Sequence, residues 1–329
     1  MAPPIPTRDM KTTAMKLPLL LAFGLLAAST ALAWDHGGHM IVAKFAYDRL
    51  TPAEQQKLGQ ALAGLDRTGK SYNGVTAACW MDDVRGSANL YQDWHFVTEP
   101  YVKTTPLPPG ENAVWAYNYA KDVFLGKKQG NAHLAGKDAK YAAAHPPVSK
   151  AEALAMMMHL AGDLHQPLHC TNHPFTDAKG RQHDEDRGGN DIAILNAPKV
   201  GGMHGAMVMK LHHFWDAAYR DSFAGNQVKE GPEWGRPSAA DSAAFGKKVH
   251  DLLDGSAPTL LSQSNAAGWL ADSHRIGIQA GYEPLGADLG KESVTLPEAY
   301  VNTANATARQ RMARAGIRLA RELKAVLKH

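Results

Sequence analysis

The stretch that begins at Ser149 constrains the fold of this chain more than any other. Ser149 and Glu152 form the Ser-x-x-Glu pattern of a helix N-terminus, and the Ala-, Leu- and Met-rich residues that follow favour a helix. His159 and Asp163 are four residues apart, so both side chains project from one face of that helix. Pro167 predicts that the helix ends or bends, because proline lacks an N–H and its ring collides with the carbonyl of Asp163.

These two side chains are of the types that bind metal ions. Two ligands four residues apart on a helix can hold one ion, as the two histidines of a zinc-protease helix do. The predicted break at Pro167 lets His169 point elsewhere, toward a second ion. The alternative is a buried helix in which His159 and Asp163 simply satisfy each other, and only the rest of the chain can separate the two interpretations.

The first 33 residues resemble a secretory signal peptide. Two lysines precede an apolar run over residues 17–26, and Ala31-Leu32-Ala33 fits a small-x-small cleavage site. The run is too short for a membrane span. We therefore expect an exported protein, periplasmic or secreted, that is cleaved after Ala33 and keeps no membrane anchor. Cleavage would make Trp34 the first residue and give it a free α-amine.

Composition restricts the function further. The formal net charge is only +3, which is no electrostatic footprint for nucleic acid, so a protein that handles phosphodiesters would need bound cations. Sixteen histidines is a high number for such a chain. The two cysteines, Cys79 and Cys170, each adjoin a candidate ligand segment, so one disulfide is plausible.

The hydrophobic pattern is helical over most of the chain, with no repeat and no linker between independent domains. It predicts one all-α domain over residues 34–329, with long irregular loops. A short extended segment is expected at residues 94–97, a short hairpin is possible around residues 192–195, and residues 224–238 form a Gly/Pro loop. Helices are expected over residues 40–50, from Thr51-Pro52-Ala53-Glu54 onward, and over residues 76–85, 112–126, 149–165, 204–219, 241–254, 262–281 and 297–327.

Further ligand-type residues lie outside the central helix. His212 and Asp216 are again four apart on a predicted helix, whereas His213 has no carboxylate at that spacing. Each pair alone is weak evidence, because a His and an Asp at this spacing often form a surface ion pair. The remaining candidates are Asp82, His95 and His39, the last of which follows Trp34.

Taken together and in order, these motifs resemble the zinc-dependent single-strand nucleases of the phospholipase C/nuclease superfamily, the S1/P1 type. The resemblance covers the chain after the leader and closes at a helix containing Ala315–Ala320. Its motifs are Trp-x4-His, Trp-x-Asp-x-x-Arg, Trp-His-Phe, His-x3-Asp-x5-His, Gly-Gly-Asn and Leu-His-x-x-Trp-Asp.

The resemblance implies three Zn²⁺ ions per chain, held by imidazole and carboxylate ligands. Asp163 is expected to bridge two of them. The first set is Asp82, His95, His159 and Asp163, the second is Trp34 (through its amine and carbonyl), His39 and Asp163, and the third is His169, His212 and Asp216.

The resemblance also implies an endonuclease that hydrolyses single-stranded DNA and RNA to 5′-phosphate products, possibly with 3′-nucleotidase activity. Zinc lowers the pKa of water from ~15.7 toward ~7, which makes a nucleophile available near neutral pH. Asp82 would orient this water or take its proton, and Arg85 would stabilise charge on the phosphate. The competing interpretation of Arg85 is a plain salt bridge with Asp82 or Asp83.

Two further residues are expected to contact substrate. Phe96 resembles an aromatic on which a base stacks, and Asn190 resembles an Asn that contacts base or phosphate. Asn190 can equally be a turn residue without a ligand. Thr98 departs from the pattern, because fungal members carry Asp two residues after the stacking aromatic, and the base preference is therefore open.

Two other functions compete. A zinc phospholipase C shares the three-metal core, but it usually has Glu as the last acid and a longer Trp-to-His spacing, so Asp216 and the Trp34–His39 spacing favour the nuclease. A non-catalytic exported zinc-binding protein would leave Arg85 and Phe96 without a role. No stable protein partner is implied, and we expect a monomer.

Overall fold

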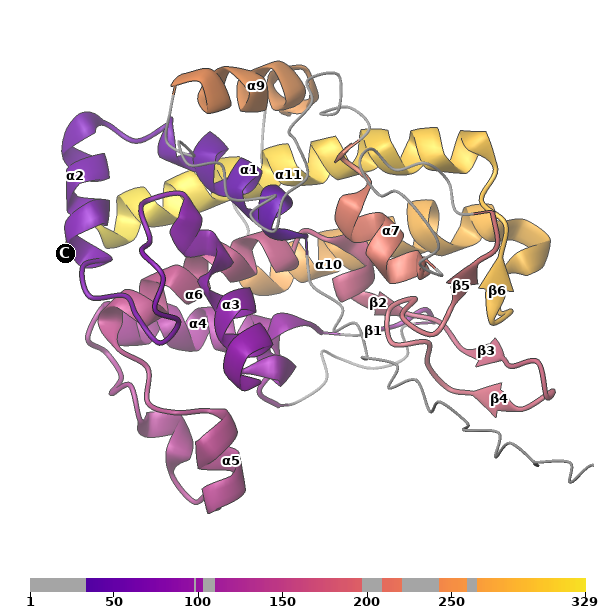
Figure 1. Ribbon diagram of the computed structural model, residues 1–329, viewed down its shortest axis with the longest axis horizontal. Helices are drawn as coiled ribbons and strands as arrows, with labels where there is room; N and C mark the ends of the chain where they lie inside the picture. Colours follow the sequence, from indigo (N-terminus) through magenta and orange to yellow (C-terminus); the bar gives the residue numbers. More distant parts are fainter. Residues whose placement is uncertain (1–33, 98, 103–109, 197–208, 221–242, 259–264) are drawn as a thin grey trace, which may run out of the picture. The chain divides into compact units, whose positions relative to one another are not determined.

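The computed structural model of the chain describes residues 34–97, 99–102, 110–196, 209–220, 243–258 and 265–329 (Figure 1). Within residues 31–329 the contacts form one unit. The α-helices are α1 (His36–Tyr47), α2 (Pro52–Ala61), α3 (Trp80–Ala88), α4 (Ala113–Phe124), α5 (Ala139–Ala144), α6 (Lys150–Asp163), α7 (Leu211–Ala217), α9 (Ala243–Leu253), α10 (Ala266–Ile276) and α11 (Glu298–Val326).

Shorter helical turns connect these helices. They are the 3₁₀ turns η1 (Thr76–Cys79), η2 (Gln92–His95), η3 (Ala132–Leu134), η4 (Pro167–His169), η5 (Asp254–Ser256) and η7 (Glu283–Asp288), and the π-helical turn η6 (Gly277–Tyr282). Strands are short and paired: β1 (Glu99–Pro100) with β2 (Thr171–Asn172), β3 (Phe175–Thr176) with β4 (Gln182–His183), and β5 (Ala193–Ile194) with β6 (Ser293–Val294). The fold is therefore all-α, as predicted.

Helix α6 is the centre of the fold. Its N-terminus has the predicted capping box, in which Glu152 N donates to Ser149 Oγ at 3.2 Å and Ser149 N donates to the Glu152 carboxylate at 2.7 Å. Every residue from Ala151 to Asp163 is buried, which is typical of a helix covered on all sides by other elements. The helix contacts α1, α3, α4, α11 and η1. It ends at Asp163, and Pro167 begins η4, so the predicted break is confirmed.

The long helix α11 packs against α1 and α6. It packs along α1, and Gly316 allows the close approach, because a Cβ there would lie 2.8 Å from the Phe45 ring. Arg311 donates from Nε to the carbonyl of His165 at 3.1 Å, just past the end of α6. Arg318 contacts the His165 ring, with Nη1 2.9 Å from Nε2. These buried arginines hold the turn between α6 and η4 in place.

The structure differs from the local predictions in three places. Only part of the segment 94–97 is extended: Trp94 and His95 belong to η2, which follows the left-handed Tyr91, whereas Phe96 has extended backbone angles. The pairing expected around residues 192–195 appears as an antiparallel bridge between Ala193 and Lys210, with Ile194 N donating to the oxygen of Met209 at 2.8 Å, while residues 197–208 between them lie outside the described residues. In addition, β5 pairs in parallel with β6, about a hundred residues away, and a separate antiparallel pair is β3–β4. Helix α5 was not expected from the sequence. The Gly/Pro loop at 224–238 and the predicted helix start at 204–208 lie outside the described residues.

The structure does not support the disulfide considered plausible from the sequence, since Cys79 and Cys170 are both free and buried. Each thiol faces a backbone carbonyl of a different segment. Cys79 Sγ lies 3.4 Å from the oxygen of His36, and Cys170 Sγ lies 3.8 Å from that of Leu164. Burial raises the pKa of the Cys170 thiol to about 12. None of the described helices is both long enough and apolar enough to cross a bilayer.

Candidate metal centre

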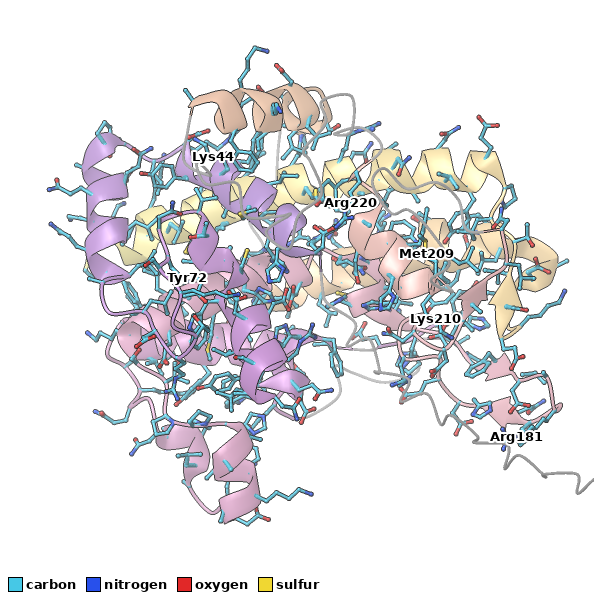
Figure 2. All side chains as sticks on the ribbon, in the orientation of Figure 1. Lys44, Tyr72, Arg181, Met209, Lys210 and Arg220 are labelled. Carbon is cyan, nitrogen blue, oxygen red and sulfur yellow. The ribbon has the colours of Figure 1, made fainter. Side chains whose placement is uncertain are left out.

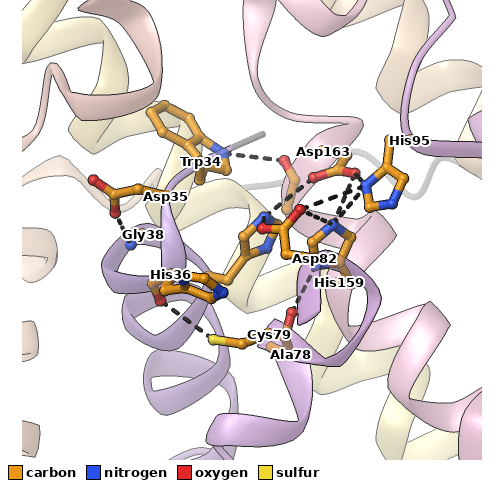
Figure 3. A network of polar contacts seen from close by, with 12 residues as sticks. Trp34, Asp35, His36, Gly38, Ala78, Cys79, Asp82, His95, His159 and Asp163 are labelled. Carbon is orange, nitrogen blue, oxygen red and sulfur yellow. Dashed lines mark hydrogen bonds and ion pairs between the residues drawn. The ribbon is translucent and has the colours of Figure 1, made fainter. Parts of the chain in front are cut away.

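The predicted ligands meet where α6 ends. One set, here called the five-residue group, is buried between α1, α3, η2 and α6 (Figure 3). A second set, the three-residue group, lies between η4 and α7. The five-residue group consists of His39, Asp82, His95, His159 and Asp163, and the three-residue group consists of His169, His212 and Asp216.

Asp163 is the hub of the five-residue group. Its Oδ2 lies 3.1 Å from His159 Nε2 and 3.3 Å from His95 Nδ1, and its Oδ1 lies 3.3 Å from His39 Nε2. Asp82 lies across the group, 3.9–4.0 Å from the same three imidazoles. The spacing His-x3-Asp on α6 therefore does what the sequence predicted, since one helical turn brings both ligand types to one point.

The three-residue group is smaller and contains one carboxylate, whereas the five-residue group contains two. Nε2 of His212 lies 3.0 Å from Nε2 of His169. The Asp216 carboxylate lies 3.7 Å from His212 and 4.0 Å from His169. In this group and in two trios of the five-residue group, the ligand atoms all lie within 4.8 Å of one another, so each could hold an ion.

Backbone carbonyls fix the orientation of three imidazoles. Nδ1 of His159 contacts the oxygen of Ala78 at 2.7 Å, Nδ1 of His169 contacts that of His95 at 3.0 Å, and Nδ1 of His212 contacts that of Gly188 at 2.7 Å. A carbonyl only accepts, so each Nδ1 must carry the proton. Burial lowers the pKa of His169 and of His212, so both rings are neutral near pH 7, and the Nε2 lone pairs of these two rings face each other.

Facing lone pairs at 3.0 Å repel each other unless a cation or a proton lies between them. The same reasoning applies to the carboxylates, since the oxygens of Asp82 and Asp163 accept no hydrogen bond of normal geometry from the described residues. Buried polar atoms without partners are rare and call for an explanation. The donor set fits divalent metal ions that take nitrogen and oxygen ligands.

The electrostatics of the two groups differ. Burial opposes ionisation of Asp163, but His159 outweighs it and holds the Asp163 pKa well below its usual range. The pKa of Asp82 is likewise lowered, because His159 and Arg85 outweigh the effect of burial. Burial lowers the pKa of His95 to about 4, so this imidazole is neutral near pH 7. In contrast, burial raises the pKa of Asp216 well above its usual range.

The predicted catalytic and stacking residues lie beside the five-residue group. Arg85 is buried one turn after Asp82, and its Nη2 is 3.2 Å from Asp82 Oδ1. Phe96 directly follows His95 and exposes 38% of its surface, which is unusual for a large apolar side chain in this protein. Thr98 lies outside the described residues.

Asn190 lies at the edge of the three-residue group and belongs to a tight turn. Its side-chain amide donates to the carbonyl of Arg187 at 2.8 Å, which agrees with the turn interpretation. Gly188 and Gly189 both have positive φ, and a Cβ on Gly188 would lie 2.2 Å from the oxygen of Leu168. This turn delivers the carbonyl that orients His212.

Trp34 is fully buried against the five-residue group. Its indole N–H donates to the carbonyl of Gly162 at 3.1 Å (Figure 3). Gly162 also makes room for the His39 ring, since a Cβ there would lie 2.9 Å from His39 Nδ1. The N-terminal Trp and His are thus both placed against the last turn of α6.

Sequence reasoning missed Gln166. Its Nε2 donates to Asp216 Oδ1 at 2.7 Å, and its Oε1 accepts from the N–H groups of Leu168 and His169. Gln166 therefore connects the turn that carries His169 with the helix that carries Asp216. Glutamine is not among the favoured N-cap residues, so the sequence carried no signal for this role.

Fold and site together define a helical protein with a buried centre of imidazoles and carboxylates suited to metal binding. The S1/P1 Nuclease family model matches residues 34–328, so the chain belongs to this family. It is 25% identical over 205 residues to Endonuclease 2 of Arabidopsis thaliana. That similarity covers 59% of this chain and 58% of the plant protein, less than two thirds of its length.

Proposed function

We propose that this protein is a zinc-dependent endonuclease that cleaves single-stranded DNA and RNA, leaves 5′-phosphates and also removes 3′-phosphates from nucleotides. The observation that carries the proposal is the convergence of imidazole nitrogens and carboxylates in the two groups. A buried set of this kind beside an exposed aromatic fits hydrolysis of a nucleic acid phosphodiester.

In this proposal the ligands are divided as the family resemblance suggests. Zinc bound at these positions supplies Lewis acidity and makes water a better nucleophile near neutral pH. The first ion would be held by Asp82, His95, His159 and Asp163, the second by Trp34, His39 and Asp163, and the third by His169, His212 and Asp216.

The protein's own side chains account for orientation and charge. Since the pKa of Asp82 is lowered, its carboxylate is a weak base, and we assign it to orienting the attacking water. Arg85 is held by Asp82 and can donate to a phosphate oxygen as negative charge builds up there. Both residues act on the five-residue side.

The preference for single strands follows from Phe96. A base must leave its stack before it can lie on this ring, which costs a few kcal/mol in a duplex. Stacking on the ring returns ~1–3 kcal/mol per base. We therefore expect Phe96→Ala to weaken binding of a single-stranded oligonucleotide by about 5- to 150-fold while the zinc content stays unchanged.

The proposal includes export and removal of the leader. If Trp34 binds zinc through its α-amine, a variant that keeps one extra residue before Trp34 should lose most activity. Full activity and full zinc content of that variant would show that the amine is not a ligand.

The decisive experiment measures zinc per chain in the processed protein and maps the products formed from a short oligonucleotide. We expect chelation to abolish cleavage of denatured DNA and of RNA, and zinc to restore it. Phosphatidylcholine serves as the control substrate for the phospholipase C alternative. If the protein binds zinc but hydrolyses no phosphodiester, the result favours the alternative of a non-catalytic zinc-binding protein.

A further inference from the structure

We propose that Asp35 is a positioning residue, whose carboxylate holds the first residues after the leader against the helix that carries His212 and Asp216. The inference deepens the proposed function, because it concerns how Trp34 and His39 reach their positions in the metal centre. Neither the family motifs nor the ligand groups include Asp35.

The Asp35 carboxylate accepts hydrogen bonds from two separate elements. Its Oδ1 accepts from Gly38 N at 2.9 Å and from the Tyr219 hydroxyl at 2.5 Å. Its Oδ2 accepts from Arg220 Nε at 2.6 Å and also forms an ion pair with Arg220 Nη2. In addition, the Asp35 N–H approaches the carbonyl of Asp216 at 3.4 Å.

These partners belong to two different segments of the chain. Gly38 is in the first turn of α1, for which Asp35 is the N-cap (Figure 3), and His39 is the next residue. Tyr219 and Arg220 follow α7, with Arg220 shown beside that helix in Figure 2. One carboxylate therefore fixes α1, which carries His39, relative to α7, which carries Asp216.

The contact is shielded from water. The side chains of Asp35 and Arg220 keep only 14% and 12% of their exposure, and the Tyr219 ring also packs edge-on against Trp34 at 6.5 Å. Charge-assisted bonds of this kind are stronger than exposed ion pairs, and the Arg fork adds geometric specificity.

Contacts that hold a segment in place matter most at the end of a chain. Terminal residues are disordered unless other contacts hold them, and ordering a ligand when the metal arrives would weaken binding. The contacts of Asp35 do not use the amine of Trp34, so they can hold the segment while leaving that amine available. Partners that orient metal ligands typically change metal affinity by ~10- to 100-fold.

The test uses Asp35→Asn in the full processed protein. Asparagine caps a helix as well as aspartate does, so α1 keeps its N-terminus while the charge pairing with Arg220 is lost. We expect ~10- to 100-fold weaker binding of one zinc ion in a chelator titration, with the other ions unaffected. We also expect faster acylation of the Trp34 α-amine by an amine-selective reagent in chelated protein.

Asp48→Asn is the matched control, because Asp48 ends the same helix and pairs with Lys44 away from the centre. It should behave as wild type in both measurements. The double variant of Asp35→Asn with Arg220→Gln should show no larger effect than Asp35→Asn alone if the two residues act as one unit.

The proposal is overturned if Asp35→Asn retains all its zinc and a protected amine, or if Asp48→Asn loses both to the same extent. Failure of the proposed function looks different, because the wild-type protein would then bind no zinc or cleave no oligonucleotide. The acylation contrast between wild type and Asp35→Asn remains measurable in that case.

Discussion

The two ligand groups are built from the same residue types and are both buried, yet the pKa values of their carboxylates shift in opposite directions. In the five-residue group, His159 keeps the pKa of Asp163 low against the effect of burial. In the three-residue group, burial raises the pKa of Asp216, and the bond from Gln166 offsets only part of it. The balance of charged neighbours, rather than burial, decides whether a buried carboxylate is ready to bind a cation.

The largest expected effect comes from removing the carboxylate of Asp163, the hub of the five-residue group. Asp163→Asn should reduce nuclease activity by on the order of 10³-fold, because it removes the carboxylate that faces three imidazoles at 3.1–3.3 Å. Zinc analysis should show loss of two ions, since Asp163 is the proposed bridge. An active variant with a full zinc complement would refute the bridging role.

Asp216→Asn should be less severe, with activity lower by about 10²-fold and one ion lost. The reason is that asparagine keeps the oxygen that accepts from Gln166 and resembles the protonated acid that burial favours. Oligonucleotide assays and metal analysis on the same preparation check both numbers. Equal losses in the Asp163 and Asp216 variants would remove the distinction between the groups.

Acidification should empty the groups in a fixed order. Metal binding requires a deprotonated carboxylate, so a raised pKa moves the loss of metal to higher pH, and a lowered pKa moves it to lower pH. The pKa is raised for Asp216 and lowered for Asp163, so the three-residue group should release its ion first as the pH falls. Affinity falls by up to about tenfold per pH unit in this range, and zinc retained after dialysis at stepwise lower pH measures it.

The smallest effect concerns a buried carboxylate outside both groups. Burial raises the pKa of Asp186 to about 6, although it accepts from Tyr282 and from the N–H of His173. A raised carboxyl pKa means that folding stability is lost as the pH rises through about 6. Asp186→Asn should therefore stabilise the protein at pH 7 by ~2–3 kcal/mol, at about 1.4 kcal/mol per pKa unit, and have little effect at pH 4.

Urea unfolding at both pH values measures this difference. The result sharpens the comparison because it tests whether burial alone raises a carboxyl pKa in this protein. If Asp186→Asn gives no gain at pH 7, the contrast drawn between Asp163 and Asp216 loses its physical basis.

Local sequence patterns predicted the helices and most of the site. The capping box at Ser149, the break at Pro167 and the two His-x3-Asp spacings follow from helical geometry, which depends on near neighbours. The family resemblance added the N-terminal residues and placed Asp82 and His95 in the same centre.

The parts that could not be predicted depend on contacts between distant residues. Nothing near Ala193 specifies that it pairs with Ser293. Closeness to a ligand did not determine where the Cys79 thiol points, and the Asn190 motif did not show that its amide closes a turn. Side-chain direction depends on the packed environment, which a single sequence does not reveal.

The carbonyl contacts of the imidazoles have a consequence for unfolding. His159, His169 and His212 are each tied to the backbone of another segment, at Ala78, His95 and Gly188. Metal ions bound by these rings would connect regions of the chain that no disulfide links. The melting temperature should therefore climb with the logarithm of free zinc, as it does for any ligand that binds only the native form.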